Sequence, residues 1–210
     1  MNLSIDQLKS KFKQPLPGTA SHLKLAPPNR AKEELLEKQN YLLAARQSAV
    51  MVLLYPVDNQ LRTAFIKRSE YDGIHSGQIA FPGGKKEKTD QNFEETALRE
   101  TFEEVGIKSD EIELIGQLSD LFIPPSNFIV KPFVGYCTHQ PTYKLDPREI
   151  QSVVEIDLAD FYSENRIFEK EFSSGTSGQT IKAPYFGIKN IEIWGATAMI
   201  TSELLDVLKK

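Results

Sequence analysis

The stretch that decides the fold is residues 83–107, which read GGKKEKTDQNFEETALRETFEEVGI. It predicts a glycine-containing loop followed by a helix over residues 92–105. Asn92 or Asp90 is suited to cap the start of this helix, because a short polar side chain accepts hydrogen bonds from its first free N–H groups. Gly106 stands where a glycine commonly ends a helix. The segment is therefore predicted to form a loop–helix–loop.

Three acidic side chains share one side of the predicted helix. At 100° per residue, Glu100, Glu103 and Glu104 lie within about 100° of one another. The opposite side is predicted to carry a narrow apolar stripe, made of Leu98, Phe102 and Val105. Acids clustered at the end of a helix are unfavourable, because they repel each other and oppose the helix dipole. We therefore expect compensation by Arg99 in part, and by a hard divalent cation held by oxygen ligands.

A solvated acidic face is the alternative explanation for three glutamates on one helix. Two neighbouring features favour a binding site instead. The loop before the helix contains Gly83 and Gly84, which let a ligand approach the backbone closely. The segment before that loop, Lys67-Arg68-Ser69, is basic and polar, and such side chains are suited to phosphate groups.

The pattern Arg99-Glu100-x-x-Glu103-Glu104-x-Gly106-Ile107, with Gly84 upstream, resembles the Nudix box. That box is a loop–helix–loop of the form G-x5-E-x7-R-E-U-x-E-E-x-G-U, where U is apolar. It binds magnesium and cleaves a nucleoside diphosphate linked to another moiety. This chain departs from the pattern at its upstream acid, which is Asp90, and at Thr101, which replaces an apolar residue. The departure leaves two roles open for Asp90: a metal-site acid or a helix cap.

The chain also resembles one branch of that family, the coenzyme A pyrophosphatases. These proteins share a second signature, L-L-T-K-R-S-x5-H-x-G-Q-V-A-F-P-G-G. This chain reads FIKRS over residues 65–69 and HSGQIAFPGG over residues 75–84. The resemblance implies hydrolysis of coenzyme A to adenosine 3′,5′-bisphosphate and 4′-phosphopantetheine, with Mg²⁺ or Mn²⁺ as cofactor. It also implies an α/β/α sandwich with a central mixed sheet.

The resemblance implies a set of site residues. Glu100, Glu104 and Glu103 are expected to bind the metal, and Glu103 and Arg99 to take part in catalysis, with Arg99 holding a box glutamate through a bidentate pair. The expected substrate-binding residues are Lys67, Arg68, Ser69, Gly83 and Gly84. The general base is left open between Glu103 and a later acid such as Glu149, which equally fits an ordinary acid at a helix start. His75 is expected to order its loop, and His22 and His139 to be incidental.

The rest of the chain predicts one α/β domain with an extension before it. Residues 1–45 are expected to form an N-terminal helical extension, with helices over 4–12 and 30–41, and residues 46–210 the Nudix hydrolase domain. Residues 48–56 are a continuous apolar run and predict a buried strand that turns at 56–59 into a hairpin partner. Further strands are predicted at 78–81, 113–118, 128–138, 153–156, 166–172, 181–186 and 191–194. A closing helix over 196–208 carries an apolar face at Ile200, Leu204, Leu205 and Leu208.

Composition narrows the class of protein. The 210 residues are 40% hydrophobic and 26% charged, with a net charge of −4, so the global basic character of a nucleic-acid-binding protein is missing. The longest apolar run is far shorter than the roughly 20 residues of a membrane helix. The start of the chain lacks a basic and apolar leader. A cytoplasmic protein with a small nucleotide substrate, and with neither nucleic acid nor membrane as partner, is therefore expected.

Two expectations concern the remaining features. The single cysteine, Cys137, lies in an apolar run and is expected to pack as a small hydrophobic residue. The N-terminal extension either covers the core or builds a homodimer interface.

Other functions compete with coenzyme A hydrolysis. One is a Nudix hydrolase that acts on another nucleoside diphosphate derivative, such as ADP-ribose, or on a nucleoside triphosphate. Another is a non-catalytic binding module with the Nudix fold, although such modules usually lose glutamates of the box, and here Glu100, Glu103 and Glu104 are all present.

Overall fold

A mixed sheet forms the centre of the molecule. The computed structural model describes residues 3–28, 45–69, 77–163, 166–174 and 179–210. The central strand β1 (Arg46–Val57) pairs in parallel with β7 (Phe128–Tyr136) and antiparallel with β2 (Gln60–Arg68). The other strands of this sheet are all antiparallel to their neighbours: β4 (Gly83–Lys85) on β1, β3 (Ile79–Ala80) and β8 (Ile150–Asp157) on β2, and β5 (Glu113–Gln117) and β6 (Leu121–Ile123) on β7.

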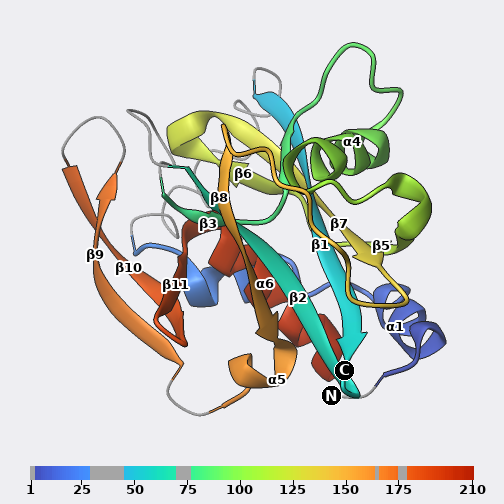
Figure 1. Ribbon diagram of the computed structural model, residues 1–210. Helices are drawn as coiled ribbons and strands as arrows, with labels where there is room; N and C mark the ends of the chain where they lie inside the picture. Colours follow the sequence, from blue (N-terminus) through green and yellow to red (C-terminus); the bar gives the residue numbers. More distant parts are fainter. Residues whose placement is uncertain (1–2, 29–44, 70–76, 164–165, 175–178) are drawn as a thin grey trace.

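Helices cover both faces of this sheet (Figure 1). Met51 and Leu53 of β1 pack into the core beside α4 (Phe93–Val105). Val52 and Leu54 pack into the second core, beside α6 (Gly195–Lys209). Because β1 is buried on both faces, its sequence is a continuous apolar run rather than an alternating one. The predicted α/β/α sandwich with a central mixed sheet is confirmed.

The predicted hairpin at residues 56–59 is also confirmed. Asp58 and Asn59 join β1 to β2 with φ angles of 48° and 63°. Two successive residues with positive φ match the twist of an antiparallel pair, and Asp and Asn tolerate this conformation better than most residues. This turn fixes the register of β2, the strand that ends at Arg68.

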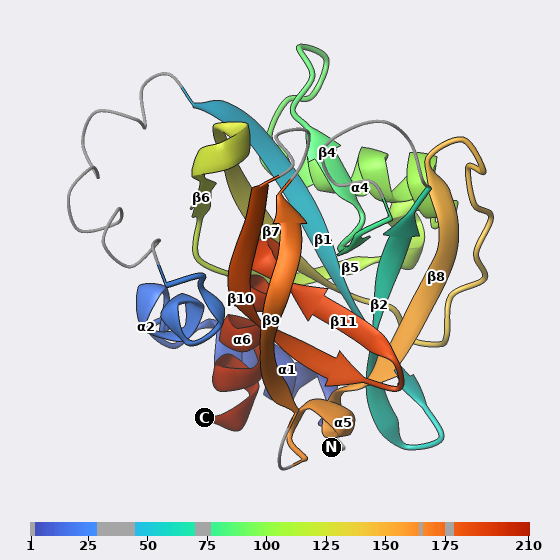
Figure 2. The ribbon, with the colours of Figure 1, turned by 90° about the vertical axis from the view of Figure 1, so that its left-hand side faces the viewer.

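A second, smaller sheet packs against α6. Its strands are β9 (Ile167–Ser174), β10 (Gln179–Ile188) and β11 (Ile191–Trp194), all antiparallel. Figure 2 shows this sheet in front, with α5 (Leu158–Phe161) at its lower end. Because β11 runs directly into α6, the small sheet places the first turn of that helix.

The segment before β1 packs on α6. It contains α1 (Ile5–Phe12), α2 (Thr19–His22) and the 3-10 turn η1 (Leu23–Leu25). The predicted helix over 4–12 is thus present, and Ser4 caps it. Leu8 and Leu25 are buried in the same core as α6. The predicted apolar face of α6 is confirmed, because Ile200, Leu204, Leu205 and Leu208 are all buried. The helix is also buried on a second side, at Thr201, Ser202 and Glu203.

A buried ion pair fastens this segment to α6, so His22 is not incidental. Its Nε2 lies 2.9 Å from Glu203 Oε2, and the two side chains are 2% and 0% exposed. The N–H groups of Gly18 and Ser119 donate to the same carboxylate, each at 3.0 Å. The Ser119 hydroxyl donates to it as well, at 2.6 Å. We call this group of residues, His22, Glu203, Gly18 and Ser119, the clasp.

Further expectations concern Cys137, the helix at 30–41, His75 and membrane-spanning helices. Cys137 is buried, as predicted. The predicted helix at 30–41 and His75 lie outside the described residues. Within the described ranges, none of the helices is both long and apolar enough to cross a membrane.

Candidate active site

The helix α4 begins and ends where the sequence predicts. Asn92 Oδ1 accepts a hydrogen bond from the N–H of Glu95 at 2.8 Å, so Asn92 and not Asp90 is the N-cap. Gly106, with φ of 77°, ends the helix in the left-handed conformation, which costs glycine little. The helix is followed by the 3-10 turn η2 (Ser109–Glu111).

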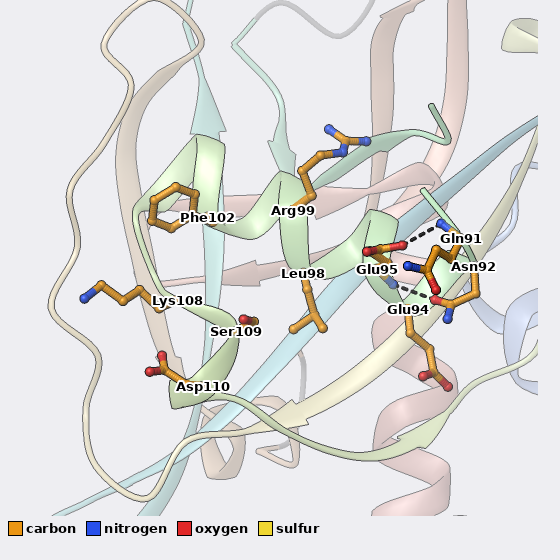
Figure 3. Close-up of a pocket in the computed structure, with 10 residues that line it drawn as sticks. All are labelled: Gln91, Asn92, Glu94, Glu95, Leu98, Arg99, Phe102, Lys108, Ser109 and Asp110. Carbon is orange, nitrogen blue, oxygen red and sulfur yellow. Dashed lines mark hydrogen bonds between the residues drawn. The ribbon is translucent and has the colours of Figure 1, made fainter. Parts of the chain in front are cut away.

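The predicted apolar stripe of α4 is confirmed at Val105, which is buried, and at Leu98, which packs against the same core, but not at Phe102. Ala97 and Thr101 are fully buried, whereas Phe102 is 52% exposed. Small side chains at the contact let the helix lie close to β1 and β4, and the bulky ring is left outside. Figure 3 shows Leu98 and Phe102 among the residues that line an open groove of about 750 Å³ on this outer side. None of the three box glutamates lines that groove, so the candidate site lies on the other side of the helix.

Glu104 faces the sheet and is the most deeply buried acid of the box. It is 2% exposed. Its Oε2 accepts a hydrogen bond from the N–H of Gly83 at 2.8 Å, and its Oε1 one from Arg68 Nη2 at 3.2 Å. The pKa of Glu104 is raised to about 7, mainly by burial and further by the nearby charges of Glu100 and Glu149. The charge of Arg68 and the hydrogen bond from the Gly83 N–H oppose this rise only in part.

Glu100 lies against the glycine pair of β4. A Cβ atom on Gly84 would come within 2.5 Å of the Glu100 carboxylate, so this approach needs glycine. Gly83 has a φ of 153°, and a Cβ atom there would lie 2.3 Å from the carbonyl oxygen of Ala49. Burial raises the pKa of Glu100, and the hydrogen bond from Arg99 partly opposes that rise.

Arg99 joins three acids, and its bidentate partner is Asp90 rather than a box glutamate. Its Nε and Nη2 donate to the two Asp90 oxygens at 2.9 and 3.0 Å. Its Nη1 donates to Glu100 and Glu103, each at 2.9 Å. The hydrogen bonds from Arg99 hold the pKa of Asp90 well below its usual range. Asp90 also accepts from the Thr96 hydroxyl, so it orders the start of the helix and the guanidinium together.

Comparison with known proteins identifies the family. The NUDIX domain family matches residues 45–174. This chain belongs to the NUDIX domain family. The loop–helix–loop around α4 is its Nudix box.

Two relatives carry the same description, "Uncharacterized Nudix hydrolase NudL". The protein of Pectobacterium atrosepticum is 32% identical over 161 residues, which are 76% of this chain and 81% of the relative. The protein of Yersinia enterocolitica is 33% identical over 138 residues, 66% of this chain and 69% of the relative. These relatives and the family match support a Nudix hydrolase, and the relatives' names state no substrate.

Solved structures share the fold. A MutT/nudix family protein from Enterococcus faecalis has a TM-score of 0.53 at 17% identity, with 100% of this chain and 76% of that chain covered. The MutT protein from Methanosarcina mazei has a TM-score of 0.50 at 18% identity, with coverages of 79% and 95%. At these identities the likeness concerns the fold alone.

Of the basic and polar segment Lys67-Arg68-Ser69, only Arg68 has a hydrogen bond to the Nudix box among those of the described residues. Alternation along β2 places Phe65 in the core beside α6 and Ile66 in the core beside α4. The pairing of β2 with β8 shifts its register between Lys67 and Arg68, so the alternation does not extend past Lys67. Arg68 Nη2 meets Glu104 Oε1 at 3.2 Å, and none of the hydrogen bonds or ion pairs of the described residues joins Lys67 to the box. The two basic residues therefore differ in their contacts with the box, and the sequence alone did not separate them.

Ser69 connects this segment to a loop that the sequence left ambiguous. Its N–H donates to the carbonyl oxygen of Glu149 at 2.8 Å. Glu149 precedes β8 in a turn and does not start a helix, which corrects that alternative. The negative charge of Glu149 raises the pKa of both Glu100 and Glu104, so the turn brings a fourth acid to the box.

The Nudix box supplies oxygen donors that fit a hard divalent cation. Within the described residues, no three Asp, Glu, His or Cys side chains are drawn together into a ready metal site. Glu104 is nevertheless buried and Glu100 partly buried, and the charges of further carboxylates, Glu103 or Glu149 among them, raise the pKa of each. A divalent cation relieves this repulsion, and carboxylate oxygens are ligands that Mg²⁺ and Mn²⁺ prefer. Glu103, with a side chain 55% exposed, forms the outer rim of this acidic group.

Proposed function

We propose that this Nudix protein hydrolyses the diphosphate bond of coenzyme A or of its derivatives, with Mg²⁺ or Mn²⁺ as cofactor. The observation that carries the proposal is the meeting of two separate motifs at one carboxylate. Glu104 of the Nudix box accepts hydrogen bonds from Arg68 of the upstream signature and from Gly83 at its end. The signature that resembles coenzyme A pyrophosphatases is thus part of the same site as the box.

Each residue of the site has a proposed part in the reaction. Glu100, Glu104 and Glu103 would hold the metal, which when bound neutralises the diphosphate and lowers the pKa of a water molecule. Arg99 positions Glu100 and Glu103 through its Nη1. Gly83 and Gly84 keep the approach to the backbone open, because a side chain there would enter the space of Ala49 or Glu100.

The remaining substrate contacts are proposed for the end of β2. Arg68 lies between Glu104 and the carbonyl oxygen of Gly83, which is 3.3 Å from its Nη2. From there it serves to bind a diphosphate oxygen beside the metal. Lys67 and Ser69 are proposed to assist it, Lys67 as the neighbouring cation and Ser69 through the turn that its N–H holds.

Two acids are candidates for the base that activates water. Glu103 is exposed, but its carboxylate forms an ion pair with Arg99. Glu149 is exposed in the turn before β8 and lies close enough to raise the pKa of Glu104. We propose Glu149, because none of the described cations is paired with its carboxylate. If this is right, Glu149→Gln lowers kcat more than Glu103→Gln, with metal affinity measured separately for both variants.

The test of the function is direct product analysis. Purified protein is incubated with coenzyme A and Mg²⁺, and the products are separated by chromatography. Adenosine 3′,5′-bisphosphate and 4′-phosphopantetheine are expected, and a chelator or Glu104→Gln should abolish both. Glu94→Gln is the matched control, because Glu94 lies on the same helix but lines the outer groove.

Other outcomes of this assay would replace the proposal. Turnover of ADP-ribose equal to that of coenzyme A would keep the site but move the substrate class. Binding of nucleotides in Mg²⁺ with cleavage of none of them would indicate the non-catalytic module.

A further inference from the structure

A cavity of about 310 Å³ is lined by the glycine pair of β4 and by residues of the core beside α6, such as Val50 and Ile200. Gly83 and Gly84 form one end of it, and the start of α6, from Trp194 to Ile200, forms another wall. Val50 of β1 and Phe128 of β7 lie between them. The cavity therefore continues from the diphosphate end of the proposed active site into the core beside α6.

The charges that line this cavity are confined to one end. Among the described lining residues, the charged side chains are Arg68, which contacts Gly83, and Lys85, which follows Gly84 in β4. The remaining walls are largely apolar, as at Ile123 and Val130. A charged group placed deep in such a cavity would lose its hydration without a partner.

The hydroxyl groups that line the cavity are already used as donors. Ser48 donates to the carbonyl oxygen of Ile129 at 3.2 Å, and Thr197 to that of Ile79 at 3.0 Å. Ser126 donates to a backbone carbonyl in its own turn. A nucleobase needs hydrogen-bond donors and acceptors that match its edges. The hydroxyl hydrogens of these three residues already donate to backbone carbonyls, so they are not available as donors to a base. A chain of aliphatic carbons with isolated amide groups needs fewer such partners, and its amide N–H groups can still donate to these hydroxyl oxygens, which keep their acceptor lone pairs.

The size of the cavity suits one part of a substrate. Pockets that enclose a whole drug-sized ligand measure about 300–1,000 Å³, and this one is at the lower limit. The cavity is too small to enclose both halves of a dinucleotide-sized molecule. Because its charged lining residues, Arg68 and Lys85, lie beside the glycine pair, the diphosphate is expected to stay there.

We propose that this cavity binds the uncharged arm of the diphosphate substrate, an aliphatic amide chain of the pantetheine type. The diphosphate then lies at Gly83 and Gly84, and the phosphorylated nucleoside half stays outside the cavity. This placement of the diphosphate rests on the proposed function. Pro27 and the residues from Trp194 to Ile200 lie outside the part of the chain that the family matches. The substrate arm is thus selected by segments that flank the Nudix domain match.

The chain contains a single tryptophan, and it lines the cavity. The fluorescence of Trp194 therefore reports on occupancy without any catalytic turnover. In the presence of a chelator, titration with pantetheine or 4′-phosphopantetheine should change the Trp194 emission in a saturable way. Adenosine 3′,5′-bisphosphate should leave the emission unchanged.

Two variants fill the cavity from different walls. Ala196→Leu and Ala80→Leu add volume at lining positions, and each should weaken the fluorescence response to pantetheine at least tenfold. Circular dichroism and thermal melting identify which variants are folded. If one of the two variants fails to fold, the other still tests the inference. Phe102→Ala, on the outer side of α4, is the control and should bind as the unchanged protein does.

The outcomes separate this inference from the proposed function. A response to the bisphosphate but not to pantetheine would assign the cavity to the nucleotide half and overturn the inference. Cleavage of coenzyme A without any response of Trp194 to the arm, or with unchanged arm affinity in folded cavity-filling variants, would also overturn it and leave the function standing. Binding of the arm without cleavage of coenzyme A would support the inference and refute the function.

Discussion

Glu104 shows how one residue combines structural and chemical roles. A glutamate on a helix is normally exposed, but Glu104 is buried against Gly83 and Arg68. Two hydrogen bonds, one of them from a guanidinium, do not fully replace the water that this carboxylate loses. The remaining imbalance favours a bound cation, which is consistent with the proposed metal site.

The raised pKa of Glu104 predicts how stability depends on pH. Its folded pKa of about 7 exceeds the ordinary value of 4.5, so the folded state holds the proton more tightly than the unfolded state. The associated stability is present below about pH 4.5 and is lost as the pH rises through about 7. In chelator, we expect Glu104 to cost the protein on the order of 2 kcal/mol between about pH 5 and 8.

Thermal melting with chelator and with Mg²⁺ checks this prediction. Mg²⁺ binds the ionised carboxylate, so its stabilising effect should be larger at about pH 8 than at about pH 5. Glu104→Gln should flatten the difference between the two pH values. An equal pH dependence in the variant would assign the effect to other groups.

At the scale of elements, the contact between α4 and β4 determines the site. The sequence predicts the limits of α4 well, because a cap and a terminal glycine act locally. It misplaces Phe102, which is more hydrophobic than Ala97 and Thr101 and yet lies outside, because only the small pair allows close packing. Which side of a helix is buried depends on the surface that it meets.

The two glycines of β4 should therefore respond differently to substitution. Gly83→Ala places a Cβ against the Ala49 backbone at a φ of 153° and is expected to cost about 1–3 kcal/mol of stability or more. Gly84→Ala meets only the flexible end of Glu100, so it should displace that carboxylate and weaken metal binding about 10-fold, as losses around a metal site do, while the protein stays folded.

Urea unfolding and calorimetric Mg²⁺ titration measure the two effects. Equal loss of stability in both variants would contradict this assignment. So would unchanged metal affinity in Gly84→Ala.

At the scale of the molecule, the clasp joins the beginning of the chain to its end. Burial alone would raise the pKa of Glu203, but hydrogen bonds from His22 and Ser119 outweigh it and lower the pKa. Its contribution to stability is therefore present above the ordinary pKa of glutamate and is lost as the pH falls through the lowered value. Leu8 and Leu25 share a core with α6, and we propose that residues 1–45 are an extension that covers this core.

Breaking the clasp should destabilise the whole fold. His22→Ala removes a buried hydrogen-bond partner of the Glu203 carboxylate, which is expected to cost about 1–3 kcal/mol or more. Urea unfolding measures the loss, and the double variant with Glu203→Gln should lose less than the sum of the two single variants. Strict additivity would show that the pair does not act as a unit.

The sequence by itself determined the family resemblance, the limits of α4, the strand β1 with its two buried faces, and most of the acids of the site. These features arise from local capping, hydrophobic periodicity and a contiguous motif. Only the tertiary structure decided that Arg68 and not Lys67 meets Glu104, that Arg99 pairs with Asp90, and that Glu149 approaches the box. It also joined His22 to Glu203, which are 181 positions apart. Such contacts depend on which face each element buries and on how distant segments dock, and no local pattern encodes either.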